Sequence, residues 1–304
     1  MMDVAGAEDA KLMRALGVDA ETLAKFKRVR EGAIADARAM GKPRTGKIRV
    51  LGVSGSARDS ADMAAEDSNS EELLKRCLSH CEKLGAETEL LPLRNYRIEH
   101  CKACYSTVNT QCHFYCSCYP KGESGDDMTN VVYDKLLAAD AILFATPVNN
   151  FKISTLMSAF IDRCISMDGS LSPADPQDPK NRELNVKHMK FIEMTSDNAI
   201  PGSGLLRRFP GKIAGIIVTG HEEGASMAIS QLFLTLNNFG MLFPPFSHVY
   251  AMSSICKPTY EDKPLVTGDC YSEEVRMLAE NVIRAARLAR AARPTDWEYD
   301  CRAN

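Results

Sequence analysis

The feature that most constrains this chain is a repeated alternation of short apolar segments with segments of helical periodicity. Each short run is rich in β-branched residues, which is typical of a strand buried on both faces. Such runs occupy residues 47–53, 87–91, 141–145 and 212–218, with a fifth expected within 241–249. Helical patterns follow at residues 68–78, 128–138, 154–165, 225–239 and 272–292. This order predicts an α/β fold with a doubly wound, five-stranded parallel sheet and helices on both faces.

The N-terminal segment has a pattern of its own. Apolar residues recur at helical spacing before Gly17, and Asp19 is placed to cap a second helix. We therefore predict a helical N-terminal extension at 1–44, a central domain at 45–294 and a C-terminal tail at 295–304. Two long loops do not belong to a minimal sheet unit and are expected to be functional: a cysteine-rich loop at 95–125 and an insertion at 167–209.

Charge and composition exclude several classes of protein. The 304 residues carry a formal net charge of −3, and no long basic run is present. Binding to nucleic acid or to an anionic membrane is therefore not expected. The first residues lack the pattern of a secretory signal, and no apolar run approaches the roughly 20 residues of a membrane span. We expect a cytoplasmic protein, in which thiols stay reduced.

Three loops that follow strands carry residues suited to a ligand. The first has small hydroxyl residues at Ser54, Ser56, Ser68 and Ser70, which let a backbone approach a phosphate beside a helix N-terminus. Its serines could instead only cap a helix and form a turn. The second loop, residues 146–151, offers amides and an aromatic ring for a planar heterocycle. The third, residues 219–224, has glycines that permit tight turns. In open α/β sheets, such loops meet where strand order reverses.

These segments resemble a known family. The sequences VSGSAR…SNS, ADAILFATPVNNFKIS…FIDR and GIIVTGHEEG resemble the flavodoxin-like NADPH-dependent FMN reductases over residues 47–250. The cysteine loop and the Gly125–Met128 run after it resemble the iron–sulfur flavoproteins. The resemblance implies a flavodoxin-like fold, an FMN cofactor, NAD(P)H as co-substrate and a homo-oligomer.

The resemblance also implies roles for individual residues. It assigns the phosphate to Ser54, Ser56, Arg58, Ser68, Asn69 and Ser70. It assigns the isoalloxazine ring to Pro147, Val148, Asn149, Asn150 and Phe151. It assigns the pyrimidine side of the ring to Thr219, Gly220 and His221. His221 is the one residue placed to tune or protonate the ring edge; a loop histidine exposed to solvent is the alternative.

Five cysteines cluster within eighteen residues. They are Cys101, Cys104, Cys112, Cys116 and Cys118. A C-x-x-C pair brings two thiolates onto one metal or cluster, and soft thiolate ligands suit a [4Fe–4S] cluster or zinc. Free thiols, with or without a redox disulfide, are the third interpretation.

Three functions follow. The first is an NAD(P)H-dependent FMN oxidoreductase that reduces a quinone, a flavin or another small acceptor by hydride transfer through flavin N5. The second is an iron–sulfur flavoprotein that carries electrons between a ferredoxin-like donor and FMN. The third is a non-enzymatic flavin or metal redox sensor.

Overall fold

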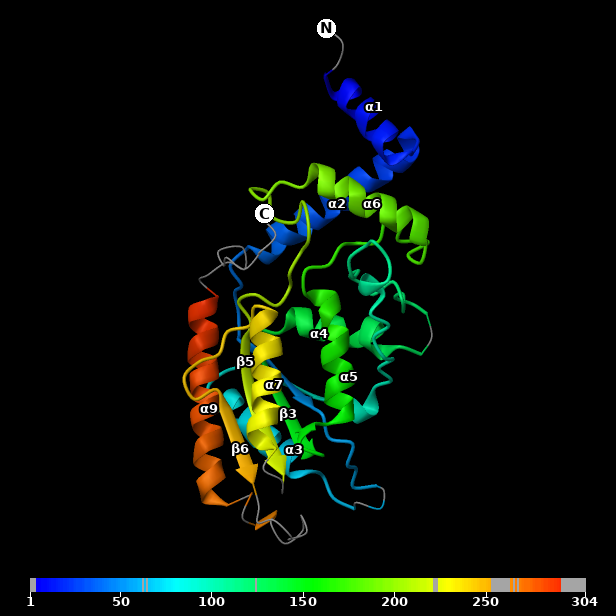
Figure 1. Cartoon of the computed structure of the whole chain (residues 1–304). Coiled ribbons are helices and arrows are strands. Elements are labelled where there is room, and N and C mark those ends of the chain that lie inside the picture. Colours follow the sequence, from blue (N-terminus) through cyan, green and yellow to red (C-terminus); the bar gives the residue numbers. More distant parts are fainter. Residues whose placement is uncertain are drawn as a thin grey trace.

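A parallel sheet forms the centre of the computed structural model, which describes residues 4–61, 63, 65–123, 125–220, 224–252, 263–264, 266 and 268–290. The strands are β1 (Arg49–Ser54), β2 (Glu87–Pro92), β3 (Ala141–Asn149), β5 (Ile213–Gly220) and β6 (His248–Met252). They are arranged in the order β2-β1-β3-β5-β6, all parallel (Figure 1). The two-residue strand β4 (Lys152–Ile153) pairs antiparallel with the end of β3. The predicted doubly wound sheet is confirmed.

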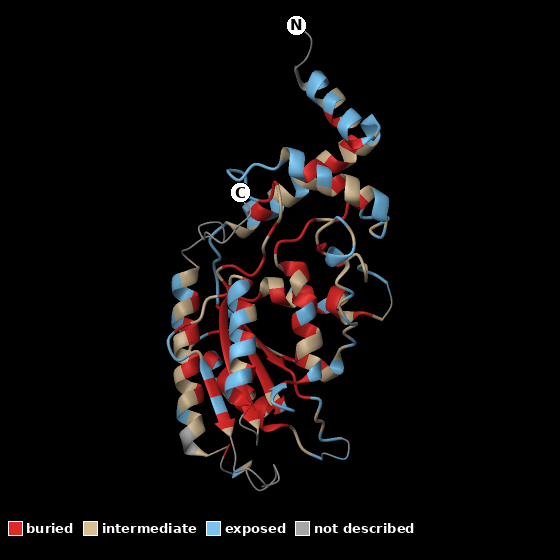
Figure 2. Ribbon diagram, in the orientation of Figure 1, coloured by how far each residue is buried: buried red, intermediate tan, exposed pale blue. Residues whose placement is uncertain are grey.

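Helices cover both faces of this sheet. The helices and shorter helical turns in the described part of the chain are α1 (Val4–Leu16), α2 (Ala20–Met40), α3 (Asn69–Lys83), η1 (Leu93–Asn95), η2 (Cys104–Ser106), η3 (Met128–Val132), α4 (Tyr133–Ala138), α5 (Thr155–Cys164), η4 (Ile165–Met167), α6 (Arg182–Thr195), α7 (Ala225–Asn238) and α9 (Asp269–Ala289). Helices α3 and α9 share one apolar cluster with the sheet, whereas α4, α5 and α7 share another. The central strands β1, β3 and β5 are mostly buried between these layers, whereas the edge strands β2 and β6 are partly exposed (Figure 2).

Side-chain alternation along the strands explains the two clusters. In β3, Ile142 and Phe144 pack on the α5 side, whereas Leu143 packs on the α3 side. Successive residues of a strand point to opposite faces, so a central strand needs apolar residues at every position. This is why the continuous apolar run identifies a strand that is covered twice.

The N-terminal extension is helical, as predicted, and packs away from the sheet. Leu23 and Phe26 of α2 share a third apolar cluster with Phe191 and Ile192 of α6. Helix α6 lies in the 167–209 insertion, so the insertion covers the N-terminal helices (Figure 1). His188 of α6 is also buried there, with ring centroids 5.0 Å from Phe26.

Two elements differ from the prediction. The fifth parallel strand begins at His248, close to the end of the expected 241–249 segment. Pro244 and Pro245 lie inside that segment and lack the N–H groups that a ladder needs, so the strand starts after them. Strand β4 was not predicted, because two residues are too short a segment to show a strand pattern in the sequence. Among the described helices, none combines the length and the apolar character that crossing a membrane requires.

Candidate functional site

The three predicted loops leave the sheet at the same edge. Ser54 at the end of β1 pairs with Ala145 of β3, and Pro147 further along β3 pairs with Thr219 of β5. The chain goes from β1 to β2 on one side and then to β3 on the other, so strand order reverses between β1 and β3. Ligands of open α/β sheets bind beyond the carboxyl ends of the strands at this point.

The first loop leads to the N-terminus of α3. Ser68 caps the helix, and its Oγ accepts a hydrogen bond of 3.2 Å from the backbone N–H of Glu71. The hydroxyls of Ser68 and Ser70 lie 3.1 Å apart, and both side chains are buried. Asn69 is 7% exposed, and its Oδ1 has no hydrogen-bond partner. A helix N-terminus surrounded by hydroxyls and an unsatisfied amide fits an anionic ligand with further polar groups.

The same loop places Ser56 and Arg58 in a turn. The backbone N–H of Arg58 donates to Ser56 Oγ at 3.1 Å, and Ser56 is buried. Ser154, the N-cap of α5, donates to the carbonyl of Gly55 at 2.6 Å. The start of this loop is therefore tied to the loop after β3.

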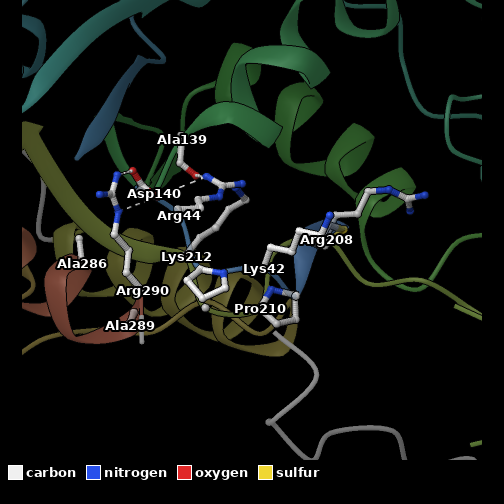
Figure 3. A pocket seen from close by; sticks show the side chains of 14 residues that line it. Lys42, Arg44, Ala139, Asp140, Arg208, Pro210, Lys212, Ala286, Ala289 and Arg290 are labelled. Carbon is white, nitrogen blue, oxygen red and sulfur yellow. Dashed lines mark hydrogen bonds and ion pairs between the residues drawn. The ribbon is translucent and has the colours of Figure 1, made fainter. Parts of the chain in front are cut away.

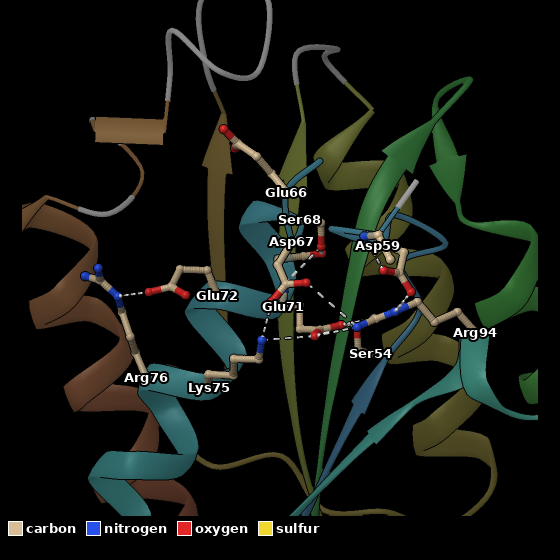
Figure 4. Close-up of polar contacts among 12 residues, drawn as sticks. Ser54, Asp59, Glu66, Asp67, Ser68, Glu71, Glu72, Lys75, Arg76 and Arg94 are labelled. Carbon is tan, nitrogen blue, oxygen red and sulfur yellow. Dashed lines mark hydrogen bonds and ion pairs between the residues drawn. The ribbon is translucent and has the colours of Figure 1, made fainter. Parts of the chain in front are cut away.

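A buried carboxylate lies directly behind the α3 N-terminus (Figure 4). Glu71, whose side chain is 2% exposed, accepts hydrogen bonds from Ser54 Oγ at 2.7 Å and from both terminal nitrogens of Arg94. Lys75 Nζ lies 3.2 Å from it. Burial favours the neutral acid, but the hydrogen bonds from Arg94 and Ser54 outweigh it and lower the pKa of Glu71. The hydroxyl proton of Ser54 is thus engaged by Glu71.

The second loop is a tight hairpin between β3 and β4. Asn149 pairs with Lys152, which leaves Asn150 and Phe151 as the two turn residues. Both have left-handed backbones, with φ of 51° and 63°. That is the conformation of a type I′ turn, and it is strained for a bulky aromatic residue. The Phe151 side chain is 55% exposed, so this turn presents an aromatic ring to solvent.

The third loop closes against the second. Gly224 lies so near the hairpin that a Cβ atom there would be 2.5 Å from the Cα of Phe151. A Cβ atom on Gly220 would be 2.9 Å from the Cβ of Val148. The two glycines therefore permit a contact that no larger residue allows. Thr219 is buried beside them, whereas His221 lies outside the described residues.

The cysteine loop brings three of its five thiols into contact. The Cys118 thiol hydrogen-bonds the sulfurs of Cys104 and Cys116. These bonds lower the pKa of Cys104 to about 7 and that of Cys116 to about 6, and they raise that of Cys118. Burial raises the pKa of Cys112 to about 12 and, to a smaller extent, that of Cys101.

A buried arginine anchors this loop to α5. Arg163 is 1% exposed and holds Asp126 with two hydrogen bonds of 2.8 and 2.9 Å. It also donates to the carbonyl of Glu99 at 2.9 Å and to Thr129 Oγ1 at 3.1 Å. Its guanidinium carbon lies 4.6 Å from the centre of the Tyr119 ring. Both ends of the cysteine segment are therefore fixed to one side chain.

The thiols do not form a metal site as they stand. Among the residues that the structure describes, no set of three or more His, Cys, Asp or Glu side chains is placed to hold a metal ion. Cys118 contacts its two neighbours by hydrogen bonds, and Cys112 Sγ lies 3.5 Å from Ser166 Oγ. The arrangement does not fit the predicted [4Fe–4S] or zinc ligand set, and no chemistry is assigned through such a group.

A small cavity lies at the opposite edge of the sheet (Figure 3). Its volume is about 60 Å³, and Arg44, Lys212 and Arg290 line it together with Asp140. Lys212 Nζ donates to the carbonyls of Leu137 and Ala139 at 2.9 and 2.6 Å. These cations therefore satisfy the last carbonyls of α4 and Asp140, which gives the cavity a role in stability.

Comparison with known proteins tests the family assignment. Residues 48–254 match the family model described as NADPH-dependent FMN reductase, which is more than half of the chain. The chain belongs to the NADPH-dependent FMN reductase family. The predicted resemblance is thus confirmed.

Individual relatives of this FMN reductase family member cover only part of its length. An iron–sulfur flavoprotein of Archaeoglobus fulgidus is 31% identical over 115 residues, which are 38% of this chain and 50% of that protein. An iron–sulfur flavoprotein of Methanosarcina thermophila is 27% identical over 118 residues, 39% and 53% of the two chains. The chain thus spans about half the length of these curated relatives.

One solved structure confirms the fold. RosB with bound 8-demethyl-8-formylriboflavin-5′-phosphate superposes with a TM-score of 0.57 at 18% identity and covers 82% of each chain. A likeness at this identity shows the flavodoxin-like architecture of the FMN reductase family member and no more.

Four residues of this site were missed in the sequence: Glu71, Arg94, Asp126 and Arg163. One signal was available, because Ser68 and Glu71 have the spacing of a capping box. In that motif the glutamate returns to the cap, whereas here it turns to Arg94. Asp126 and Arg163 lie in the Gly125–Met128 and FIDR runs that carry the family resemblance, but no role was predicted for them. Arg94 has no local signal, since its partner Glu71 lies 23 positions away.

Proposed function

We propose that this chain is an FMN-dependent oxidoreductase that takes a hydride from NADH or NADPH and passes it to a quinone, a flavin or another small acceptor. The observation that carries the proposal is the convergence of the three loops. Ser154 bonds Gly55, and Gly224 packs on Phe151, so segments far apart in sequence meet at the strand-order reversal.

The described residues suit the two ends of FMN. The phosphate would lie at the α3 N-terminus beside Ser56, Ser68, Asn69 and Ser70, where hydroxyls and free N–H groups are concentrated. Arg58 would add charge from the same loop. Ser54 would act through Glu71, which already accepts its proton.

The ring would lie between the β3–β4 hairpin and the β5–α7 loop. Pro147, Val148, Asn149, Asn150 and Phe151 would form one wall, and Thr219 and Gly220 would form the other. His221, which lies outside the described residues, is proposed for the second wall from the sequence alone. When bound, the flavin supplies hydride acceptance at its N5 atom. The chain's own part is to orient the ring, exclude water and offer backbone N–H groups to its polar edge. We propose that the protein acts as a homo-oligomer.

The test is binding followed by turnover. We expect the purified protein to bind FMN, measured by quenching of flavin fluorescence, and to oxidise NADH or NADPH when a quinone is added. Gly224→Val should abolish FMN binding, because its side chain would enter the hairpin backbone. Gly32→Ala, at a helical position with open space, is the matched control and should bind normally. A wild-type protein that binds no flavin would refute the proposal.

A second candidate is favoured by the iron–sulfur flavoproteins among the relatives. In this case the chain would transfer electrons from a ferredoxin-like donor. Iron and zinc analysis of protein purified without oxygen decides between the two. Stoichiometric iron, with no NAD(P)H oxidation, would favour the second candidate.

A further inference from the structure

Arg94 joins both ends of the phosphate loop. It follows β2, and its terminal nitrogens hydrogen-bond Glu71 on the first turn of α3, with Nη2 3.0 Å from Oε1. Its Nη2 is 3.9 Å from Asp67 Oδ1, and its Nε is 3.7 Å from Asp59 Oδ2. Asp59 lies near the start of the loop and Asp67 at its end (Figure 4). One guanidinium therefore connects the two ends of the loop and the helix.

The burial of these groups separates their roles. The Arg94 side chain is 16% exposed and that of Glu71 is 2% exposed, so these two form a buried pair. The aspartates are 43% and 35% exposed, and each alone would contribute little. Because one guanidinium serves all three carboxylates, each further contact orders fewer side chains. The planar fork of arginine suits this geometry, whereas a lysine offers a single point charge.

Charge gives Arg94 a second effect on the same loop. Glu71 is three residues from the N-cap of α3, and its negative charge would repel a phosphate there. Arg94 and Lys75 both lie on this carboxylate and offset its charge. The helix N-terminus thus remains attractive to an anion.

We propose that Arg94 is a positioning residue for the phosphate of the flavin. It holds Asp59 toward Glu71, and together with Lys75, whose Nζ lies 2.6 Å from Asp67 Oδ2, it holds Asp67 there as well. In this way it fixes the two ends of the phosphate loop, near Ser56 and Ser68, in the conformation that receives the phosphate. This inference rests on the proposed function, since it requires FMN at the α3 N-terminus. It goes further in naming a residue outside the loop that sets the preference for a phosphorylated flavin.

The test compares FMN with riboflavin, which lacks the phosphate. We expect Arg94→Gln to weaken FMN binding about tenfold or more, while riboflavin affinity changes less than about twofold. Arg94→Lys should lose most of the same preference, because it cannot contact three carboxylates. Arg97→Gln is the matched control: Arg97 lies three residues on, is 72% exposed and pairs with Glu99. It should leave both affinities unchanged. A general loss of structure would weaken both flavins and lower the melting temperature.

A double variant, Asp59→Asn with Asp67→Asn, distinguishes a positioning role from a simple charge effect by the direction in which FMN affinity changes. Removing two negative charges near the phosphate should tighten FMN binding if charge alone matters. The positioning role predicts the opposite, a several-fold weaker FMN with riboflavin unchanged. These aspartates are partly exposed, so the variant tests the idea even if Arg94→Gln does not fold. Unchanged or tighter FMN binding overturns the inference. A wild-type protein that binds neither flavin refutes instead the proposed function.

Discussion

Replacing Arg163 by methionine tests how the cysteine loop is held. The variant keeps an apolar stem of similar length but removes four hydrogen bonds, two to Asp126, one to the Glu99 carbonyl and one to Thr129. Asp126, whose side chain is 5% exposed, is then left as a buried carboxylate without its cation. Breaking a buried pair in this way costs about 3–5 kcal/mol.

The structure favours the lower end of that range. Asp126 still accepts backbone N–H groups from Glu99 and Thr129, each at 3.1 Å, so part of its hydrogen bonding survives. We therefore expect Arg163→Met to lower the free energy of unfolding by about 3 kcal/mol. With a urea m-value of about 3 kcal/mol per M, the unfolding midpoint falls by about 1 M.

Urea unfolding followed by circular dichroism measures this change. Arg284→Met is the control, because Arg284 is 68% exposed and pairs with Glu280 at the surface. Its cost should stay below about 1 kcal/mol. A cost below about 1 kcal/mol for Arg163→Met as well would show that the buried pair does not hold the loop.

The pH dependence gives an independent check on the same pair. Burial favours neutral Asp126, but the hydrogen bonds from Arg163 outweigh this effect and lower its pKa in the folded state. The unfolded state then binds more protons, so the stabilisation is complete above the unfolded pKa of about 3.9. It is lost as the pH falls through the folded pKa. The difference in stability between wild type and Arg163→Met should therefore shrink on acidification; a constant difference would contradict the assignment.

Three further changes test the rest of the structure. Gly224→Ala places a Cβ atom 2.5 Å from the Cα of Phe151, so fluorescence titration should show weaker FMN binding, with Gly32→Ala unchanged; equal affinities would contradict the loop contact. Ser68→Ala removes the cap of α3 and should lower the free energy of unfolding by about 1 kcal/mol, measured in urea, and the cap is unimportant if the midpoint does not move. Lys212→Met removes one donor from the carbonyls of Leu137 and Ala139, which keep Arg44 as a second donor, and should cost about 0.5–1.5 kcal/mol, whereas a gain in melting temperature would show that burying the amine costs more.

The sheet could be predicted because each central strand carries its signal locally. Residues 141–145 are apolar at every position, as a strand covered on both faces must be. The last strand was harder to place, because the apolar segment that contains Pro244 and Pro245 cannot form a ladder until it passes them.

The site could be predicted only at the level of its loops. Ser68 and Gly224 lie in the loops that follow strands β1 and β5, and the fold brings such loops together at one edge. The partners of Glu71 depend instead on how β2 lies beside β1, and that of Arg163 lies 37 residues away. No local periodicity encodes such pairs, so they require the tertiary structure.

The packing of α2 on α6 joins the N-terminal extension to the 167–209 insertion, two segments that lie outside the sheet and the helices that flank it. Leu23 and Phe26 are buried in one cluster with Phe191 and Ile192, to which Leu12, Leu16, Leu171 and Ala174 also belong. Their cluster is separate from the two that flank the strands. Segments coupled in this way open as one unit, so their amides should exchange with solvent at a common rate that differs from that of the core. Deleting the first 41 residues would thus expose an apolar surface on the insertion and favour aggregation.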